Sequence, residues 1–406
     1  MAMLAVEEAL SRLLAKVAIL PAETVPLERA IDRILAVPLT ARRTQPPFDA
    51  SAMDGYAVRA ADLDPEGSPL RIIGESAAGH PFDGELSAGQ AVRIFTGAPM
   101  PGGADTVLIQ ENAERVGGDA LRPTQTEEEG RNVRLAGNDF AEGDPVLESG
   151  TRLDFAALSL AAAASYPDLR VYRQPKVAIL ATGDELKLPG EALAPGQIIA
   201  SNSFGLAALV TDMGGIPVDL GIVPDDPEAL AAAIEKARTA GVEIVVTLGG
   251  ASVGDHDLVQ QAMIDAGMEL DFWKIAMRPG KPLMVGRLDD IHVLGLPGNP
   301  VSSMVCAHLF LRPLMARLQG AEHQTALEEA QLVAPLPANG NRQHYMRATA
   351  WRQDGAWKVE PAHSQDSSLI GVMASSNALI VCPPGAPAAD AGTTVSIDFW
   401  RRPFAR

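Results

Sequence analysis

The stretch Leu296-Pro297-Gly298-Asn299-Pro300-Val301-Ser302-Ser303 decides the fold of this chain. It follows a strand-like apolar segment, His292 to Leu296, and leads into a segment of helical composition, Val301 to Leu318. Its two prolines stiffen the loop, and two hydroxyl residues stand in the first turn of the expected helix. A strand, a loop and a helix in this order are typical of α/β proteins, and a helix N-terminus is suited to binding an anion.

The same strand–loop–helix pattern precedes this stretch three times. The expected pairs are Val177 to Ala181 with Phe204 to Asp212, Val218 to Val223 with Pro227 to Thr239, and Ile244 to Leu248 with Asp255 to Ala266. Helices that alternate with buried strands favour a mostly parallel sheet. Residues 173–321 are therefore predicted to form a central α/β domain.

The segments on either side of this domain have other sequence patterns. After Gly320 only strand-like runs follow, which predicts an all-β, barrel-like C-terminal domain over residues 322–406. Residues 45–137 hold short β-like runs between Gly and Pro clusters, which indicates a β-rich insertion. Helical patterns at residues 2–17, 27–35 and 154–165 flank it, so residues 1–44 and 138–172 are expected to form one discontinuous helical linker domain.

Composition excludes several classes of protein. The 406 residues carry a formal net charge of -18, which argues against a nucleic-acid partner and requires a locally basic pocket for any anionic substrate. No apolar run approaches the ~20 residues of a membrane span. Glu7 and Glu8 stand where a signal peptide is basic, so we expect a cytoplasmic protein. Cys306 and Cys382 are too few for a disulfide framework or a zinc site.

Three carboxylates in the loops after the strands are candidate site residues. Glu185 follows the first strand, in a loop where Pro and Gly prevent a regular helix, and a solvated loop carboxylate explains it equally well. Asp226 is the expected cap of the helix at Pro227, which leaves Asp225 without that role. Asp257 follows the Gly-rich turn 249–254, where it is also a favourable first-turn charge.

Three cations stand just before the opening stretch. Lys274 and Arg278 are four residues apart, which puts both on one face of an extended segment, and Lys281 follows a Pro-Gly turn. In an acidic protein, basic groups beside a helix terminus indicate an anion site. Solvated charges on a strand edge are the alternative.

The insertion has three unusual segments of its own. They are Ser51 to Arg59, Thr96 to Asp105 and Asn132 to Asp139. A hairpin turn at Asp54-Gly55 and an ordinary surface loop after Thr96 explain two of them as well as a functional site does. Pattern and spacing thus predict a multidomain α/β protein with an anion-binding pocket, and no particular reaction.

Four of these segments closely resemble the MoeA family, which includes the E domain of gephyrin. They are Ser51-Ala52-Met53-Asp54-Gly55-Tyr56-Ala57-Val58-Arg59, Thr182-Gly183-Asp184-Glu185-Leu186, Pro279-Gly280-Lys281-Pro282 and Gly295 to Ser302. The likeness runs over nearly the whole chain. It implies a homodimeric transferase that inserts molybdate into adenylylated molybdopterin, releases AMP and uses Mg²⁺. It also implies a molybdopterin-binding-like α/β domain, whose site the insertion of the other subunit completes.

The resemblance also implies roles for individual residues. Asp54, Glu185, Asp225 and Asp257 are implied to be catalytic, and Asp54, Asp139 and Glu185 to hold the metal. The implied ligands of substrate and anion are Thr96, Arg134, Lys274, Arg278, Lys281, Pro297, Pro300, Ser302 and Ser367. Arg278 stands where the family often has lysine, and an arginine presents a planar fork in place of a point charge.

Three other interpretations remain open at this point. The related molybdopterin adenylyltransferase resembles the α/β domain, but the other domains of this chain are extra to that protein. A scaffold that holds receptor peptides, as gephyrin does, is a second alternative, and no partner-binding tail is visible in the sequence. An insertase for tungstate is the third. The adenylyltransferase and cofactor-free molybdoenzymes are further expected partners.

Overall fold

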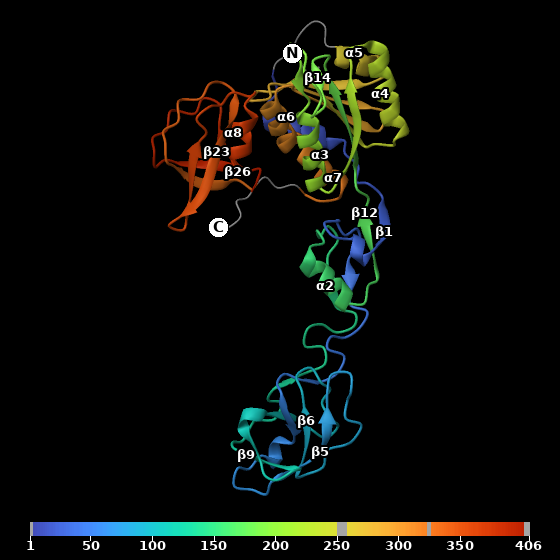
Figure 1. Cartoon of the computed structure of the whole chain (residues 1–406), viewed down its shortest axis with the longest axis vertical. Coiled ribbons are helices and arrows are strands. Elements are labelled where there is room, and N and C mark those ends of the chain that lie inside the picture. Colours follow the sequence, from blue (N-terminus) through green and yellow to red (C-terminus); the bar gives the residue numbers. More distant parts are fainter. Residues whose placement is uncertain (1–2, 250–257, 323–325, 402–406) are drawn as a thin grey trace. The chain divides into compact units, whose positions relative to one another are not determined.

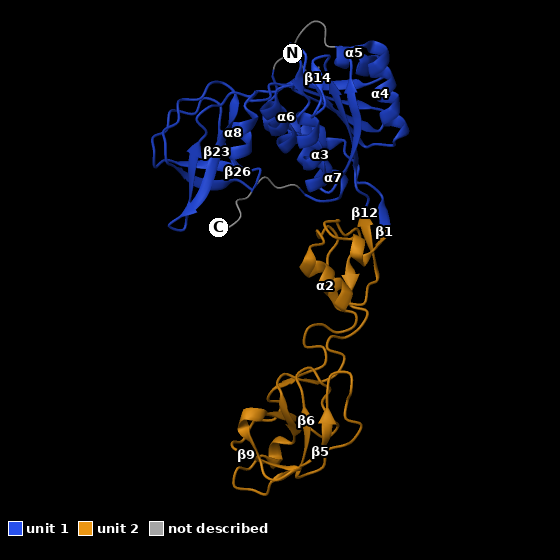
Figure 2. Ribbon diagram, in the orientation of Figure 1, with its two compact units in different colours: residues 1–23, 172–406 blue, residues 24–171 orange. Residues whose placement is uncertain are grey.

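The structure is a computed structural model, and it describes residues 3–249, 258–322 and 326–401. Its contacts divide the chain into two compact units (Figure 1 and Figure 2). One unit comprises residues 1–23 and 172–406, and the other comprises residues 24–171.

A six-stranded sheet forms the centre of the first unit. Its order is β16-β13-β17-β21-β20-β18, in which the first four strands are parallel and the last two are antiparallel. The strands are β13 (Lys176–Thr182), β16 (Ile216–Val223), β17 (Ile244–Leu248), β18 (Glu269–Lys274), β20 (Pro282–Leu288) and β21 (Ile291–Leu296). Leu248 pairs with both Ala181 and Leu296, so three strands end side by side. The predicted mostly parallel sheet is confirmed.

Helices cover both faces of this sheet. One face packs against α1 (Val6–Ala15), α3 (Asn202–Asp212) and a helical run made of α6 (Pro300–Cys306), the π-turn η4 (Ala307–Leu311) and α7 (Arg312–Leu318). The other face packs against α4 (Pro227–Thr239) and α5 (Leu258–Asp265). The predicted N-cap of α4 is confirmed, because Asp226 Oδ1 accepts a hydrogen bond from Ala229 N at 2.9 Å.

The C-terminal segment of the first unit forms a closed barrel. Each strand pairs with two neighbours in the circle β23-β24-β22-β26-β25, and β19 (Met277–Arg278) adds to β23 from the α/β domain. The strands are β22 (Glu328–Leu332), β23 (Gln343–Gln353), β24 (Ala356–Pro361), β25 (Ala378–Cys382) and β26 (Thr394–Phe399), and α8 (Ile370–Ser375) lies between β24 and β25 in the chain. The predicted barrel-like domain is confirmed.

The second unit contains a six-stranded sheet and a smaller helical part. The sheet runs β7-β4-β6-β5-β9-β8, and α2 (Phe155–Ala163) begins at Asp154, which accepts hydrogen bonds from Ala156 N and Ala157 N. The sheet strands are β4 (Gly55–Val58), β5 (Leu70–Ser76), β6 (Gln90–Ile94), β7 (Thr106–Ile109), β8 (Ala113–Arg115) and β9 (Ala120–Pro123). The shorter elements are β2 (Leu39–Thr40), β3 (Ala50–Ser51), β10 (Val133–Arg134), β11 (Pro145–Leu147), η1 (Leu27–Arg29), η2 (Ala60–Asp62) and η3 (Gln110–Asn112).

Two expectations for the N-terminal segment need correction. The helix predicted over residues 27–35 is wrong, since only the 3₁₀ turn η1 forms there and Leu35 forms an isolated bridge with Val171. Asp32 has φ 61°, which ends any right-handed helix. Helix α1 is confirmed, but it packs into the core of the α/β sheet through Val6, Ala9 and Leu13. The predicted domain boundaries stay predictions.

The chain crosses between the two units twice, at residues 23–24 and 171–172. Strands β1 (Ala22–Pro26) and β12 (Asp168–Tyr172) pair with each other at these crossings. Within the part of the chain that the structure describes, we find no helix with the length and apolar character that crossing a membrane needs.

Candidate active site

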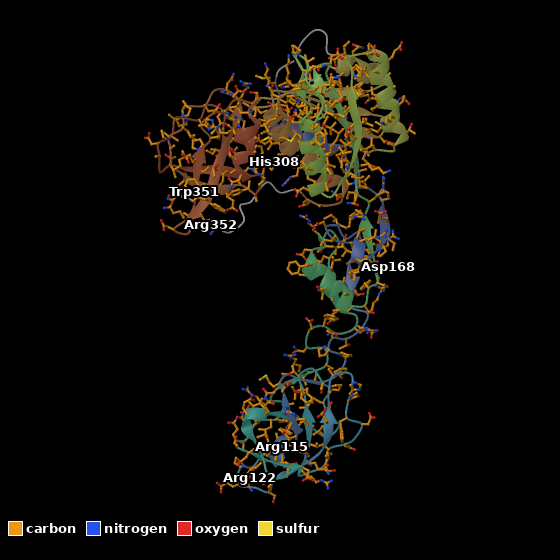
Figure 3. All side chains as sticks on the ribbon, viewed as in Figure 1. Arg115, Arg122, Asp168, His308, Trp351 and Arg352 are labelled. Carbon is orange, nitrogen blue, oxygen red and sulfur yellow. The ribbon has the colours of Figure 1, made fainter. Side chains whose placement is uncertain are left out.

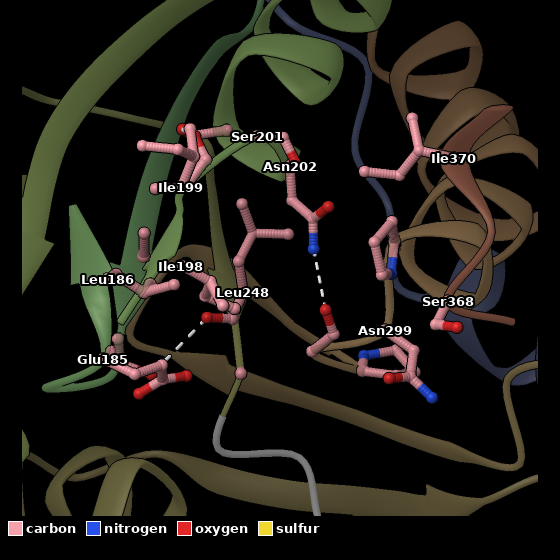
Figure 4. A pocket seen from close by; sticks show the side chains of 18 of the residues that line it. Glu185, Leu186, Ile198, Ile199, Ser201, Asn202, Leu248, Asn299, Ser368 and Ile370 are labelled. Carbon is pink, nitrogen blue, oxygen red and sulfur yellow. Dashed lines mark hydrogen bonds between the residues drawn. The ribbon is translucent and has the colours of Figure 1, made fainter. Parts of the chain in front are cut away.

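A pocket of about 680 Å³ opens where β13, β17 and β21 end (Figure 4). Ligand sites of open α/β sheets lie at the carboxyl ends of the strands, and this volume suits a small-molecule ligand. Its lining includes Thr182, Glu185, Asn202, Gly249, Pro282, Pro297, Gly298, Asn299, Pro300 and Ser368. Apolar side chains of Leu186, Ile198, Ile199, Leu248 and Ile370 form much of the remaining wall.

The loop before α6 forms one wall of this pocket. Predicted site residues Pro297 and Pro300 line it, and Asn202 Nδ2 donates to Gly298 O at 2.8 Å (Figure 4). Ser303, whose hydroxyl stands in the first turn, donates to Pro297 O and is therefore occupied by the backbone. Ser302 is buried and does not line the pocket.

Predicted residue Ser367 contacts the start of α6 from the C-terminal domain. Its hydroxyl accepts a hydrogen bond from Asn299 Nδ2 at 2.9 Å, and its carbonyl accepts one from Val301 N at 3.1 Å. The neighbouring Ser368 lines the pocket. Proline at position 300 has no N–H, and Val301 N–H is already bonded, so this helix start offers an anion fewer backbone donors than the sequence indicates.

Carboxylates gather near the opposite side of the pocket. Glu185 lines it, and Asp225 N donates to Asp184 Oδ1 at 3.3 Å. Burial, together with the charges of Asp184 and Glu185, raises the pKa of Asp225 above its usual value. Two predicted residues, Glu185 and Asp225, are thus close enough to influence each other, although Asp225 is not part of the lining.

The same carboxylates are the candidates for a metal site. Among the residues that the structure describes, no group of three or more His, Cys, Asp or Glu side chains is arranged to hold a metal ion. Mg²⁺ commonly binds one or two carboxylates and completes its shell with water and substrate phosphate. A pair of repelling carboxylates such as Glu185 and Asp225 therefore fits Mg²⁺ that arrives with a phosphate ligand.

The three predicted cations lie along the chain from the end of β18 to the start of β20. Lys274 ends β18 and lies over the Trp273 ring at 4.2 Å, and Arg278 is exposed at the end of β19. Lys281 directly precedes Pro282, which lines the pocket. The intervening turn needs glycine, because a Cβ on Gly280 would lie 2.4 Å from Cys306 Sγ and its φ is 96°.

The structure adds a cation that the sequence did not indicate. Arg347 on β23 is fully buried, and its Nε and Nη1 atoms have no hydrogen-bond partner within the described residues. Its Nη2 donates to Ser364 O at 3.4 Å and Asp366 O at 3.2 Å, in the loop that carries Ser367. Burial and the charge of Arg278 lower the pKa of Arg347, partly offset by Asp366. No local pattern in the sequence indicates this burial, because it depends on the loop at residues 364–366.

In the second unit, the structure brings Asp54 and Thr96 together. Asp54 Oδ1 accepts hydrogen bonds from Thr96 N and Thr96 Oγ1, both at 2.8 Å. These bonds, with a smaller effect of Arg93, lower the pKa of Asp54. Ser51 holds the two segments in place, because its N bonds to Ala98 O and its O accepts from Gly97 N. The hydrogen bonds from Thr96 give Asp54 a role beyond that of a simple hairpin turn.

The remaining predicted residues have weaker support. Arg134 lies on β10 and pairs with Ala50 of β3, the strand that precedes Asp54 in the chain. Asp139 is exposed, and its backbone N donates to Gln45 O at 3.1 Å. Asp257 and most of the Gly-rich turn lie outside the described residues. The roles proposed for all these residues stay predictions.

Fold and pocket define the class of protein: a ligand-binding α/β domain in a chain that also carries an inserted β domain and a C-terminal barrel. Residues 4–165 match the MoeA N-terminal region (domain I and II), residues 178–317 a probable molybdopterin binding domain, and residues 329–400 the MoeA C-terminal region (domain IV).

Full-length relatives agree with these matches. The molybdopterin molybdenumtransferase of Nostoc sp. is 38% identical over 92% of this chain and 88% of its own length. That of Haemophilus influenzae is 35% identical over 98% of both. The crystal structure of the molybdopterin biosynthesis MoeA protein from Pyrococcus horikosii, 31% identical, superposes with a TM-score of 0.82 over 99% of this chain and 100% of that chain. The chain belongs to the MoeA family.

Proposed function

We propose that this chain is a transferase of molybdenum cofactor biosynthesis, which inserts molybdate into adenylylated molybdopterin and releases AMP. The names of its relatives support molybdenum transfer to molybdopterin. The observation that carries the proposal is the strand-end pocket, which has the Glu185 carboxylate on one wall and the Asn299–Ser367 contact on the other.

The chemistry of the pocket agrees with cleavage of a phosphate linkage. Such a reaction needs cations at the developing negative charge and an oriented nucleophile. In the proposal Lys274, Arg278, Lys281 and Arg347 supply positive charge for the phosphate and the oxyanion, and Glu185 and Asp225 orient the attacking water. Mg²⁺, when bound by these carboxylates and the substrate phosphate, neutralises charge on the leaving group.

The experiment uses purified chain, adenylylated molybdopterin, molybdate and Mg²⁺, with AMP release and reconstitution of a cofactor-free molybdoenzyme as readouts. Asp54→Ala and Glu185→Ala are expected to abolish AMP release and to retain the fold. Glu235→Ala, which removes an exposed carboxylate on α4, is the matched control and should keep full activity. Unchanged turnover in either Asp54→Ala or Glu185→Ala would contradict the catalytic assignment.

We also propose a homodimer in which each subunit supplies Asp54 and Thr96 to the other. The support is the resemblance, together with two sets of candidate residues that belong to different units of one chain. Mixing Asp54→Ala with Glu185→Ala subunits should then restore about a quarter of wild-type activity, since half of the dimers are mixed and each mixed dimer has one intact site. No recovery after subunit exchange would argue for sites within single chains.

We propose that the reaction takes place in the cytoplasm, with the adenylyltransferase and cofactor-free molybdoenzymes as partners. Both cysteines are free, which agrees with a reducing compartment. Tungstate in place of molybdate in the same assay tests the choice of metal oxyanion.

A further inference from the structure

A buried histidine–carboxylate pair joins the α/β domain to the barrel. His308 Nε2 lies 2.8 Å from Asp398 Oδ2, and the two side chains are 6% and 9% exposed. In the ion pairs Arg173–Glu243, Arg238–Asp289 and Arg312–Asp212 of the same unit, by contrast, at least one side chain is more than a quarter exposed. Burying such a pair gives little net stability, because desolvation offsets the attraction. A role in orienting the barrel explains this buried pair better than a role in stability.

His308 lies in an unusual turn of the helical run. The π-turn η4 separates α6 from α7, and Pro313 follows it with no N–H to donate to the carbonyl of Leu309, four residues earlier. That missing hydrogen bond favours the wider turn, and π-turns are often found at functional sites. Figure 3 shows His308 where the helical run meets the barrel.

The barrel therefore contacts the same helical run at two points. At the start of α6, Asn299 Nδ2 and Val301 N bond to Ser367. Nine residues further on, about 13 Å along a helix, His308 contacts Asp398. The β19–β23 pairing already joins one edge of the barrel to the α/β domain. The two contacts with the helical run limit rotation of the barrel about that edge.

The first of these contacts belongs to the loop that holds Arg347. Residues Ser364 and Asp366 accept its Nη2 hydrogen bonds, and Gln365 bonds to both N and O of Arg347. Ser368, at the end of this loop, lines the pocket. Rotation of the barrel would move Ser368 away from its place in the pocket wall.

We propose that His308 and Asp398 are positioning residues, which hold the barrel in the one orientation that keeps the Ser367–Ser368 segment at the pocket. They touch no substrate themselves. The inference rests on the proposed function only in so far as it takes molybdate as the ligand of the pocket.

The test compares Asp398→Ala with the double variant His308→Leu/Asp398→Leu, which removes both polar groups and leaves no orphaned partner. We expect the Kd for molybdate, measured by calorimetry, to rise about tenfold in both. In the insertion assay the KM for molybdate should rise while kcat changes little. Asp398→Asn, which keeps a hydrogen-bond partner for His308, should restore much of the affinity.

Glu243→Ala is the matched control for lost stability. Glu243 bonds to Arg173 and to Lys176 N within the α/β domain, so its removal should lower the Tm without changing the Kd. If Asp398→Ala fails to fold, the Kd of the double variant for molybdate tests the proposal. A folded double variant with wild-type affinity for molybdate would overturn the proposal.

A second readout does not depend on the reaction. Spin labels at Glu228→Cys on α4 and Gln353→Cys on β23, two exposed positions, report the orientation of the barrel once Cys382 is replaced by serine. The distance distribution should broaden in the double variant and stay narrow in Glu243→Ala. An unchanged distance distribution in the double variant overturns the inference, even if the chain binds no molybdate. A broader distribution together with an unchanged affinity for molybdate overturns the positioning role.

Discussion

Asp54 receives two hydrogen bonds from one residue, since both the backbone N and the hydroxyl of Thr96 donate to its Oδ1 atom at 2.8 Å. The other oxygen of this exposed carboxylate receives no hydrogen bond that the structure describes. Thr96 therefore fixes the direction of Asp54 and keeps it ionised, which suits a carboxylate that must meet a metal or a nucleophile.

Thr96→Val should raise the pKa of Asp54 part of the way back toward 3.8, because the hydroxyl is lost and the backbone bond remains. A carboxyl with a lowered folded pKa contributes stability above its unfolded pKa and loses it as the pH falls through the folded value. In Thr96→Val this contribution to stability should be smaller, and its loss should be complete at a higher pH. NMR titration of the aspartate carboxyls measures the pKa of Asp54. Thr211→Val, which removes a hydroxyl on α3, should leave Asp54 unchanged.

Glu185→Gln should lower the pKa of Asp225, because one of the two like charges that raise it is removed. Burial, the largest cause, remains, so the pKa should stay above 3.8. Addition of Mg²⁺ should lower the pKa of Asp225 in the wild type, and should lower it by less in Glu185→Gln. The same NMR titration with and without Mg²⁺ checks this, and an Mg²⁺ effect of equal size in both chains would place the ion elsewhere.

Gly55→Ala should destabilise the second unit by about 1–3 kcal/mol. An added Cβ would lie 2.1 Å from Leu108 O, across the pairing of β4 with β7. Thermal unfolding measures the loss. Gly118→Ala is the control, because no atom lies within 4 Å of a Cβ at that position. Equal Tm values for the two variants would mean that β4 can move away from β7 at no cost.

Arg347→Met should weaken molybdate binding, because it removes a positive charge from the barrel beside the loop that carries Ser367 and Ser368. Arg347 is fully buried and does not line the pocket, so its charge would act on the anion without direct contact. Molybdate should raise the Tm of the wild type more than that of the variant. Arg352→Met replaces an exposed arginine on the same strand and should behave like the wild type. Equal stabilisation of all three chains would exclude Arg347 from the anion site.

Lys281→Ala should also reduce the affinity for molybdate, measured by calorimetry with sulfate as competitor, because Lys281 adjoins Pro282 at the pocket. Lys236→Ala removes a cation from the last turn of α4 and should have no effect. If Lys281→Ala binds as tightly as the wild type, the oxyanion lies away from this turn.

Local patterns predicted the α/β domain well. Strand Ile244–Leu248 and helix Pro227–Thr239 have the predicted bounds, because continuous β-branched residues and a capped Asp-Pro start are strong local signals. The segment 27–35 is apolar at helical spacing, yet tertiary contacts of Leu35 and the backbone of Asp32 override that pattern. Hydrophobic periodicity predicts helix α1, but it does not predict that this helix packs into the core of the α/β sheet.

The candidate site was only partly predictable. Loops after parallel strands lie at one edge of the sheet, so Glu185 and Pro297 could be expected in one pocket. The burial of Arg347 could not be predicted, since it depends on a loop that folds back from residues 364–366. The contact between Asn299 and Ser367 joins two domains, and no local pattern records such a pairing.

The insertion of residues 24–171 into the first unit has a consequence for synthesis on the ribosome. The second unit is continuous in sequence, so it can fold as soon as it has emerged. The segment around helix α1 emerges before that unit, yet its partners come later: Leu4 N bonds to Lys274 O, and Leu20 N to Leu318 O. This segment therefore stays without its native partners until most of the α/β domain has been made.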